Sequence, residues 1–337
     1  MGISLKQRVL DKLNANRGTF YSGQELADCL GVTRAAVWKA IVALRQEGYT
    51  IDAVTNLGYR LAPQADVLSA QAILDNLSVE VQQCIHLEYQ EVVPGTNQLL
   101  KKAAENGALE GCILVAGEQT SGRGRRGRSF YSPGGSGVYV SILLRPNQNL
   151  ENTGLLTVLA AVAAARAAEA LQKAAGLPEK KVQIKWVNDL MQQGKKVCGI
   201  LSEAATDVES GSVDYVVVGT GFNLYPPPGG WPKELKEIAG ALLPADRPVA
   251  GARALLAAMY IQQFWKLYTC FNTRQIIDEY RDRQYILGQR VCLLRPGADA
   301  VSATALDIGD NGGLWVQHSD GTTQLIRAGE VSLKKEI

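Results

Sequence analysis

Several patterns with a clear structural meaning are missing from this 337-residue chain. Its six cysteines form no C-x-x-C pair and have no histidines at metal-ligand spacing, so we expect neither a disulfide framework nor a metal cage. The N-terminal residues lack the apolar core of a signal peptide. The longest apolar stretch, residues 155–171, is alanine-rich and is interrupted by Arg166 and Glu169, which favours a packed helix over a membrane span. We therefore expect a cytoplasmic protein with no membrane contact.

The chain also lacks an excess of charge of either sign. Its net charge is +2, with 35 basic and 33 acidic residues, so binding of an anion must depend on local patches. With 46% hydrophobic and 20% charged residues, the composition is that of a globular protein and not of a disordered one. The length predicts two or three domains.

The first 63 residues predict three helices followed by a β-hairpin. The expected helices and strands cover residues 4–13, 22–30, 33–47, 49–53 and 58–61. Ser22 and Glu25 form a capping box at the start of the second helix, and Gly31 ends it. The turn to the third helix is only three residues long and ends at Thr33, which is typical of a helix-turn-helix. The hairpin makes the unit, residues 1–63, a winged helix.

The outer face of the third helix is the predicted DNA-binding surface. It begins Thr-Arg and carries few acidic residues, and Arg60 lies near the wing. The residues expected to contact or support DNA binding are Gly23, Thr33, Arg34, Ala35, Trp38 and Lys39. The alternative is a small module that binds protein.

Three further segments follow the winged helix. Residues 63–66 suggest a boundary, and a linker helix is expected over residues 67–77 within a linker of residues 64–82. Apolar runs alternate with helices over residues 83–284 and predict a central mixed α/β domain. Four short strands separated by glycine turns, at residues 290–294, 301–308, 314–318 and 322–326, predict a small β-barrel over residues 285–337. The fold class is therefore α+β and multidomain.

The stretch Gly122–Arg128 has the most unusual composition. Three glycines alternate with four arginines, so it has no apolar face and must be a surface loop. Glycine amides and guanidinium groups together suit a phosphate or a carboxylate. No P-loop motif is present. A basic loop without a specific ligand is the alternative.

Four clusters of polar residues or glycines are expected at the ends of strands in the central domain, where α/β sheets usually place their sites. They are Thr96-Asn97, Gln119–Arg128, Lys185–Asp189 and Gly219–Asn223. Each cluster alone also has a structural explanation: a helix cap, a basic loop, a turn beside a solvated strand end, or a bend. Only their combination is specific.

In combination these residues resemble the biotin protein ligase family. The resemblance is carried by Lys185-Trp186-Val187-Asn188-Asp189-Leu190, by Gly194–Leu201 and by the preceding arginine–glycine stretch. The helix-turn-helix and the terminal barrel extend it to the bifunctional members, the biotin operon repressors. It covers essentially the whole chain and implies a central domain of the biotin/lipoate ligase type and a C-terminal SH3-like barrel.

The resemblance implies an enzyme that makes biotinyl-5′-AMP from biotin and Mg²⁺-ATP and transfers biotin to a lysine of the biotin carboxyl carrier protein of acetyl-CoA carboxylase. Lys185 and Arg125 are the implied catalytic residues. Implied biotin-binding residues are Gly95, Thr96, Asn97, Gln119, Arg123, Gly124, Arg125 and Lys185. Implied nucleotide-binding residues are Gly122, Arg126, Phe130, Asn188, Gly221 and Asn223. Operator DNA and, with adenylate bound, a second copy of the chain are the implied partners, while the Mg²⁺ ligands are unknown.

The chain departs from the family pattern at four positions. Gly95 replaces the usual serine, Phe130 a tryptophan, Val187 a proline and Tyr225 an asparagine. The change at Gly95 puts one hydrogen bond to the biotin ureido ring in doubt, but no departure removes a charged group. Three alternatives stay open: a sensor that binds biotin or its adenylate without transferring it, a ligase whose helix-turn-helix is only structural, and a ligase that uses lipoate.

Overall fold

The computed structural model describes residues 4–46, 49–63, 65–146, 153–206, 212–294, 299–327 and 332–335. The chain divides into two compact units. The first comprises Met1–Leu77 and Ala245–Ala258, and the second comprises Ser78–Pro244 and Met259–Ile337. The domain limits predicted from the sequence stay a prediction.

The first unit contains the predicted winged helix. Its elements are α1 (Leu5–Ala15), α2 (Gly23–Leu30), α3 (Arg34–Gln46), β1 (Ile51–Val54) and β2 (Gly58–Leu61). Ser22 and Glu25 form the expected capping box, and Gly31 ends α2 with a φ of 67°. One face of α3, formed by Val37, Ala40, Ile41 and Leu44, is buried. Residue 47, the predicted end of the third helix, lies outside the described residues.

The linker differs from the prediction of one helix over residues 67–77. It contains two short helices, α4 (Ala70–Leu74) and α5 (Val79–Cys84). The Ser69 hydroxyl accepts a hydrogen bond of 3.1 Å from the Ala72 amide and so caps α4. The preceding Val67 and Leu68 lie outside the helix, and both are fully buried.

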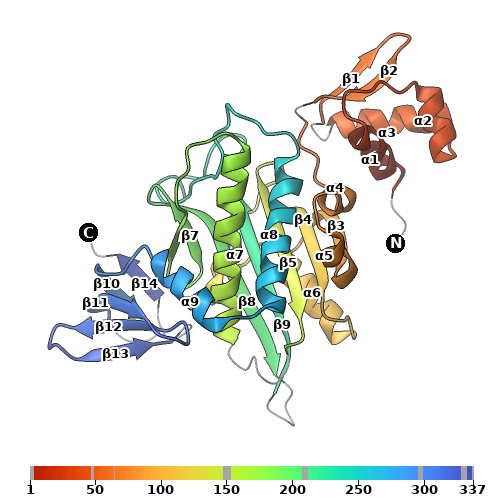
Figure 1. Cartoon of the computed structure of the whole chain (residues 1–337). Coiled ribbons are helices and arrows are strands. Elements are labelled where there is room, and N and C mark those ends of the chain that lie inside the picture. Colours follow the sequence, from red (N-terminus) through yellow and green to blue (C-terminus); the bar gives the residue numbers. More distant parts are fainter. Residues whose placement is uncertain are drawn as a thin grey trace. The chain divides into compact units, whose positions relative to one another are not determined.

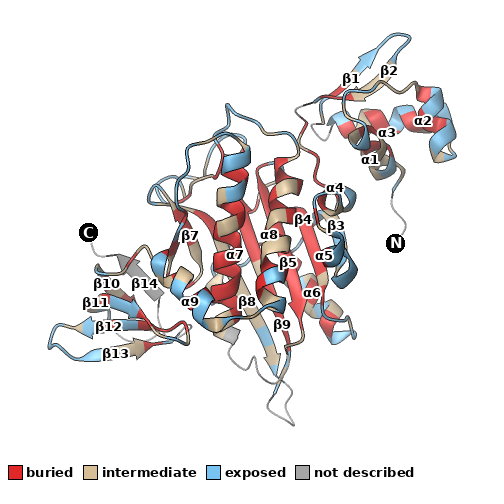
Figure 2. Cartoon of the chain, in the orientation of Figure 1, coloured by how far each residue is buried: buried red, intermediate tan, exposed pale blue. Residues whose placement is uncertain are grey.

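The second unit is built on a seven-stranded mixed sheet (Figure 1) with the strand order β3-β4-β5-β9-β8-β7-β6. Only β3 and β4 run parallel; the other neighbours are antiparallel. The strands are β3 (His86–Val93), β4 (Cys112–Gln119), β5 (Gly137–Leu144), β6 (Gln183–Lys185), β7 (Asp189–Gln192), β8 (Lys195–Thr206) and β9 (Val213–Asn223). Figure 2 shows that the central strands are buried, and every residue of β5 is buried.

Helices cover this sheet. The helices α6 (Thr96–Glu105) and α7 (Thr153–Ala174) pack on its strands, and α9 (Thr273–Asp282) packs on α7. Helix α8 (Ala252–Thr269), which belongs to this unit from Met259 on, places Tyr260 against Phe222 of β9. Within the described chain, α7 alone is long and apolar enough to span a membrane, but 67% of its most apolar window is buried. It therefore has the character of a packed core helix, as the alanine-rich sequence indicates.

Two local predictions in this unit are wrong, and one strand was missed. Thr96 and Asn97 do not cap α6, because its N-cap is Gly95 and the two residues form its first turn. Gly219 and its neighbours lie inside β9 and not at a strand end, because the strand continues to Asn223. The expected turn after Lys185 leads into β7, which pairs with β6 and had not been predicted.

The C-terminal residues form a five-stranded antiparallel sheet in the order β13-β12-β11-β10-β14. Four strands match the prediction, and the fifth, β14, was missed. They are β10 (Arg290–Leu294), β11 (Val301–Ile308), β12 (Leu314–His318), β13 (Thr323–Ile326) and β14 (Ser332–Lys335). Arg281 of α9 joins this sheet to the larger one: its guanidinium donates to Asp307 Oδ1 at 2.9 Å and to the Ile308 carbonyl at 2.8 Å.

Candidate active site

The described part of the second unit contains a cavity of about 610 Å³. All four predicted clusters contribute to its wall, although they are far apart in the sequence. The predicted site residues that line it are Gly95, Thr96, Asn97, Gln119, Arg123, Gly124, Arg125, Phe130, Lys185, Asn188 and Gly221. Such a volume is suitable for a ligand of the size of a nucleotide conjugate.

Neutral polar groups at one side of the cavity form a fixed hydrogen-bond chain. The amide and the hydroxyl of Thr96 both donate to Gln119 Oε1, at 2.9 and 3.1 Å. The buried Ser141 hydroxyl lies 2.7 Å from both Thr96 Oγ1 and Asn97 Oδ1, and its single proton can serve one of them at a time. The side-chain amide of Gln119 donates to Ser132 Oγ at 3.0 Å. These contacts hold donors and acceptors in place for a neutral polar ligand group.

Asn97 extends this chain to two charged residues. Its amide donates to Glu203 Oε2 at 2.9 Å, and Lys101 Nζ lies 2.9 Å from Glu203 Oε1. Partial burial disfavours the charged form of Glu203, but the hydrogen bonds from Lys101 and Asn97 outweigh it and lower the pKa of this carboxyl group. Gly219 leaves the space for Asn97, since a Cβ there would lie 2.0 Å from Asn97 Oδ1.

We expect Gly219→Ala to weaken biotin binding about tenfold, because the added methyl must displace Asn97 and break its hydrogen bonds, a cost of about 1.4 kcal/mol. Calorimetric titration with biotin measures the change. In an Asn97→Ala background the methyl has space, so the same glycine substitution should then cost little further affinity. Equal, additive losses in both backgrounds would show that this steric contact is not the cause.

The arginine–glycine stretch folds as a compact loop between β4 and β5. The Phe130 amide donates to the Gly122 carbonyl at 2.8 Å, and the Gly124 amide donates to the Arg128 carbonyl at 2.7 Å. Arg125 lies inside the loop, where its guanidinium is 3.4 Å from Asn188 Oδ1. Burial, together with the neighbouring Arg126, lowers the pKa of Arg125. A guanidinium group remains charged even so.

Phe130 lies against the sheet at two glycines paired across β8 and β9. A Cβ at Gly221 would lie 2.5 Å from the ring, and one at Gly199 would lie 3.0 Å from it. The ammonium of Lys196 is 5.6 Å from the ring centroid, and it also pairs with Asp189 Oδ1 at 2.6 Å. The ring can therefore form an apolar wall of the cavity next to a fixed cation.

Lys185 ends strand β6 at the cavity wall. Burial is the main cause that lowers the pKa of this ammonium group, Asp189 opposes the effect, and Lys196 and Arg128 add to it. Among the residues with described positions, none forms a hydrogen bond or an ion pair with the side-chain ammonium of Lys185. A partly desolvated cation without an ion pair can interact strongly with an anionic ligand.

Three predicted nucleotide-binding residues do not line the cavity. Gly122 supports the loop, because a Cβ there would lie 2.4 Å from the Phe130 carbonyl oxygen. Arg126 donates to the Leu294 carbonyl at 3.1 Å, and Asn223 donates to the Lys196 carbonyl at 3.2 Å. Their assignment to the nucleotide stays a prediction.

Sequence reasoning did not assign other residues that the cavity brings together. Glu203, Lys101 and Asp189 line it, and Lys196 does too. Lys196 lies within the motif Gly194–Leu201, but the motif gave no role for its side chain. Glu203 and Lys101 gave no signal, because a charged residue at a strand end or on a helix usually faces solvent.

The predicted DNA-binding residues lie together in the first unit. Thr33, Arg34, Ala35, Trp38 and Lys39 are all exposed, and 56% of Trp38 is accessible. Gly23 is buried below Arg34, whose side chain would lie 3.4 Å from an added Cβ. The wing residue Arg60 is engaged within the unit, since it pairs with Asp52 at 2.7 Å and stacks on Phe20 at 4.5 Å.

Comparison with known proteins agrees with this arrangement. The model of the biotin/lipoate A/B protein ligase family matches residues 89–223, an HTH domain matches residues 6–60, and a biotin protein ligase C-terminal domain matches residues 286–334. The chain is 40% identical over 242 residues to the bifunctional ligase/repressor BirA of Bacillus subtilis, covering 72% of each protein. It is 37% identical to the Escherichia coli protein of the same name over 212 residues, which are 61% of this chain and 60% of that one.

A solved structure is also similar. The biotin protein ligase from Aquifex aeolicus in complex with biotin and ATP matches 74% of this chain and 99% of its own, with a TM-score of 0.60 and 28% identity. The resemblance seen in the sequence is thus confirmed in fold, in domain content and in relatives. The chain belongs to the biotin/lipoate A/B protein ligase family.

Proposed function

We propose that this protein is a bifunctional biotin protein ligase and repressor. It forms biotinyl-5′-AMP from biotin and ATP and transfers the biotin to a lysine of biotin carboxyl carrier protein. The observation that carries the proposal is the cavity that combines a neutral hydrogen-bond chain around Thr96 and Gln119 with the partly buried cations Lys185 and Arg125. The neutral chain suits a ureido ring and the cations suit a carboxylate next to a phosphate.

In the first step the biotin carboxylate attacks the α-phosphate of ATP, a new P–O bond forms, and pyrophosphate leaves. Two anionic groups must approach each other, so the ammonium of Lys185 is placed to offset their charge as it is shared in the transition state. Arg125 and the amides of its loop are placed to cover the phosphate and keep water from the mixed anhydride. In the second step the carrier amine attacks the acyl carbon, an amide forms, and AMP leaves.

Mg²⁺ is part of the proposal as the usual companion of ATP. The part of the chain that the structure describes contains no group of three or more histidine, cysteine, aspartate or glutamate side chains able to hold a metal. Mg²⁺ commonly binds through substrate phosphates and water with few protein ligands, so this donor set fits an ion that arrives with the nucleotide. We assign it no protein ligand.

The enzyme assay is a direct test. Full-length protein with biotin, Mg²⁺-ATP and a carrier domain should give a carrier with one biotin on one lysine, detected by mass spectrometry. Labelled adenylate without a labelled carrier would support the sensor alternative. If lipoate is used in preference to biotin when both are present, the lipoate ligase alternative would be supported.

The exposed face of α3 supports repression of biotin genes as the second activity, with adenylate binding favouring a homodimer on a palindromic operator. All six cysteines are free, which supports a cytoplasmic location. A ligase that labels its carrier but shows no gel shift with its own biotin-gene promoter would have a purely structural helix-turn-helix.

We expect Arg34→Ala with Lys39→Ala to lower operator affinity at least tenfold, because each exposed cation contributes to contacts with phosphate or base edges. Adenylate formation should stay unchanged. Fluorescence anisotropy with the promoter at two salt concentrations measures the affinity, and Lys173→Ala, a change at an exposed lysine of the second unit, is the control. Unchanged affinity and salt dependence would remove α3 from the DNA interface.

A further inference from the structure

Strand β6 is an unusually short support for an important cation. It has three residues, ends with Lys185, and lies at the edge of the seven-stranded sheet. Its outer edge is covered by the chain that follows α9: the Ile184 amide donates to the Arg283 carbonyl, and the Tyr285 amide donates to the Ile184 carbonyl, both at 2.7 Å. Strand β7 pairs with the other edge, so the position of Lys185 depends both on β7 and on what holds residues 283–285.

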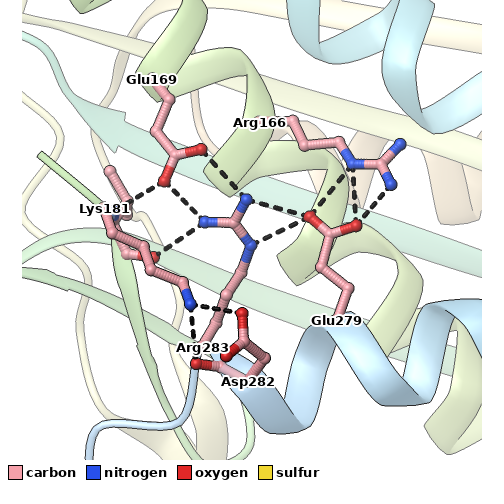
Figure 3. Close-up of polar contacts among 7 residues, drawn as sticks. Arg166, Glu169, Lys181, Glu279, Asp282 and Arg283 are labelled. Atoms are coloured by element: carbon pink, nitrogen blue, oxygen red, sulfur yellow. Dashed lines mark hydrogen bonds and ion pairs between the residues drawn. The ribbon is translucent and has the colours of Figure 1, made fainter. Parts of the chain in front are cut away.

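Those residues are held by an ion cluster made of Arg166, Glu169, Glu279 and Arg283 (Figure 3), which joins α7 to the end of α9. The guanidinium of Arg283, whose side chain is only 9% exposed, binds both oxygens of Glu169 at 2.6 and 3.0 Å. Its Nε donates to Glu279 Oε1 at 3.0 Å. Arg166 donates to both oxygens of Glu279 from the other side at 3.1 Å.

The ion cluster also reaches the backbone in front of β6. Glu169 Oε1 accepts a hydrogen bond of 2.8 Å from the Val182 amide, and Arg283 donates to the Val182 carbonyl at 3.3 Å. Both backbone groups of this fully buried residue are thus bound by the cluster. The side chains of the cluster itself do not line the cavity.

Two more contacts hold the chain beyond Lys185. The Tyr280 hydroxyl of α9 donates to the Val187 carbonyl at 2.8 Å. The indole of Trp186, which lines the cavity, donates to the Gly312 carbonyl in the turn between β11 and β12 at 3.0 Å. Lys185 is therefore the free side chain in a segment that is fixed on both sides.

Stability alone is a weak reason for such a cluster. Partly buried ion pairs often contribute no more than well-packed apolar side chains, because the desolvation of the charges offsets their attraction. A planar guanidinium that donates to two carboxylates does, however, fix the relative orientation of the three groups as well as the distances between them. An arrangement that fixes geometry is most useful where the adjacent strand must hold a reacting group within fractions of an ångström.

We propose that the ion cluster is a positioning device for adenylate formation, in which Arg283 and Glu169 fix strand β6 so that the ammonium of Lys185 stays directed into the cavity. They act through the backbone of residues 182–184 and do not touch the reacting groups. This inference rests on the proposed function, because it assigns Lys185 to the adenylation step.

The test compares Arg283→Met with Arg145→Met in the full-length protein. Arg145 binds Asp214 and the Ala104 carbonyl away from β6. Its replacement also removes a guanidinium with its ion pair, so Arg145→Met is the matched control. We expect Arg283→Met to lower the single-turnover rate of adenylate formation about 10- to 100-fold. The biotin Kd should stay within about twofold, because the proposed ureido contacts lie on α6 and β4. Arg145→Met should change neither.

Hydrogen exchange gives a measure that does not depend on activity. Peptides covering residues 182–187 should exchange faster in Arg283→Met than in the wild type or in Arg145→Met. Should Arg283→Met fail to fold, Glu169→Gln provides the same comparison with smaller effects, since glutamine keeps an acceptor for Val182, and Arg283→Lys should recover part of the rate.

Unchanged exchange together with an unchanged rate would overturn the inference, and so would an equal loss of rate and biotin affinity in a variant that remains folded. If Arg283→Met exchanges faster in β6 but the wild-type protein makes no adenylate, the proposed function is overturned. The inference that the ion cluster positions Lys185 would still stand.

Discussion

Lys185→Met should reduce the rate of adenylate formation by about 10²- to 10³-fold while the protein remains folded. The ammonium is partly buried, faces the cavity and forms no hydrogen bond or ion pair with any residue whose position is described. Its charge is therefore not already neutralised by a protein group, and it can stabilise the negative charge on the phosphate and carboxylate oxygens in the transition state. Methionine keeps most of the volume and removes only the charge. Pyrophosphate release with biotin and Mg²⁺-ATP measures the rate.

Lys195→Met is the matched control for this experiment. Lys195 belongs to the same hairpin region, but its ammonium donates to the Lys236 carbonyl at 3.0 Å and does not line the cavity. We expect it to retain the wild-type rate. Wild-type turnover in Lys185→Met would rule out this residue as the essential cation.

The pH dependence of adenylate formation is a second test of the role of Lys185. Only protonated Lys185 can act as the cation, and burial places its pKa below the ordinary value of 10.5, with Asp189 opposing the shift. Activity should therefore fall as pH rises through this lowered pKa. An arginine at the same position would move that loss of activity to higher pH.

Arg125→Gly should allow the adenylate to escape and so increase biotin labelling of bystander proteins about tenfold or more. The guanidinium lies within the loop between β4 and β5, lines the cavity and is fixed near Asn188. Without it the loop loses both a phosphate partner and the side chain that holds it closed. Mass spectrometry of lysines on an unrelated protein added to the reaction measures the escape.

Arg126→Gly is the neighbouring control. Its guanidinium donates to the Leu294 carbonyl and does not line the cavity, and its φ of 58° is one that glycine adopts without cost. We expect it to retain the adenylate as the wild type does, a result that would also remove Arg126 from the nucleotide-binding residues that the sequence predicts. Strict retention in Arg125→Gly, or equal escape in both variants, would contradict the role given to Arg125.

Much of this site could be predicted because its residues lie in continuous motifs. The loop composition between Gly122 and Arg128 excludes a core element whatever surrounds it, and the segment from Lys185 to Asp189 carries a recognisable order of residues. The winged helix was predicted for a similar reason: caps and turns such as those at Ser22 and Gly31 are local signals.

The features that were missed depend on partners distant in the sequence. Strand β7 is defined by pairing with β6 and β8, and its four residues give no clear alternation. The contact between Asn97 and Glu203 joins residues 106 positions apart, and that between Glu169 and Arg283 joins residues 114 apart. No local pattern distinguishes such a carboxylate from one that faces water. The same holds for Gly219, whose role follows only from the side chain opposite it.

The hydrogen bond from the Trp186 indole to the Gly312 carbonyl limits how this chain could be recombined with others. A ligase domain fused to a foreign tail, or truncated before residue 286, would lose the carbonyl that accepts the hydrogen bond from this indole N–H. We expect such a chimera to lose catalysis before it loses solubility. We therefore expect that the small terminal sheet and the ligase core of this protein cannot be exchanged as independent modules.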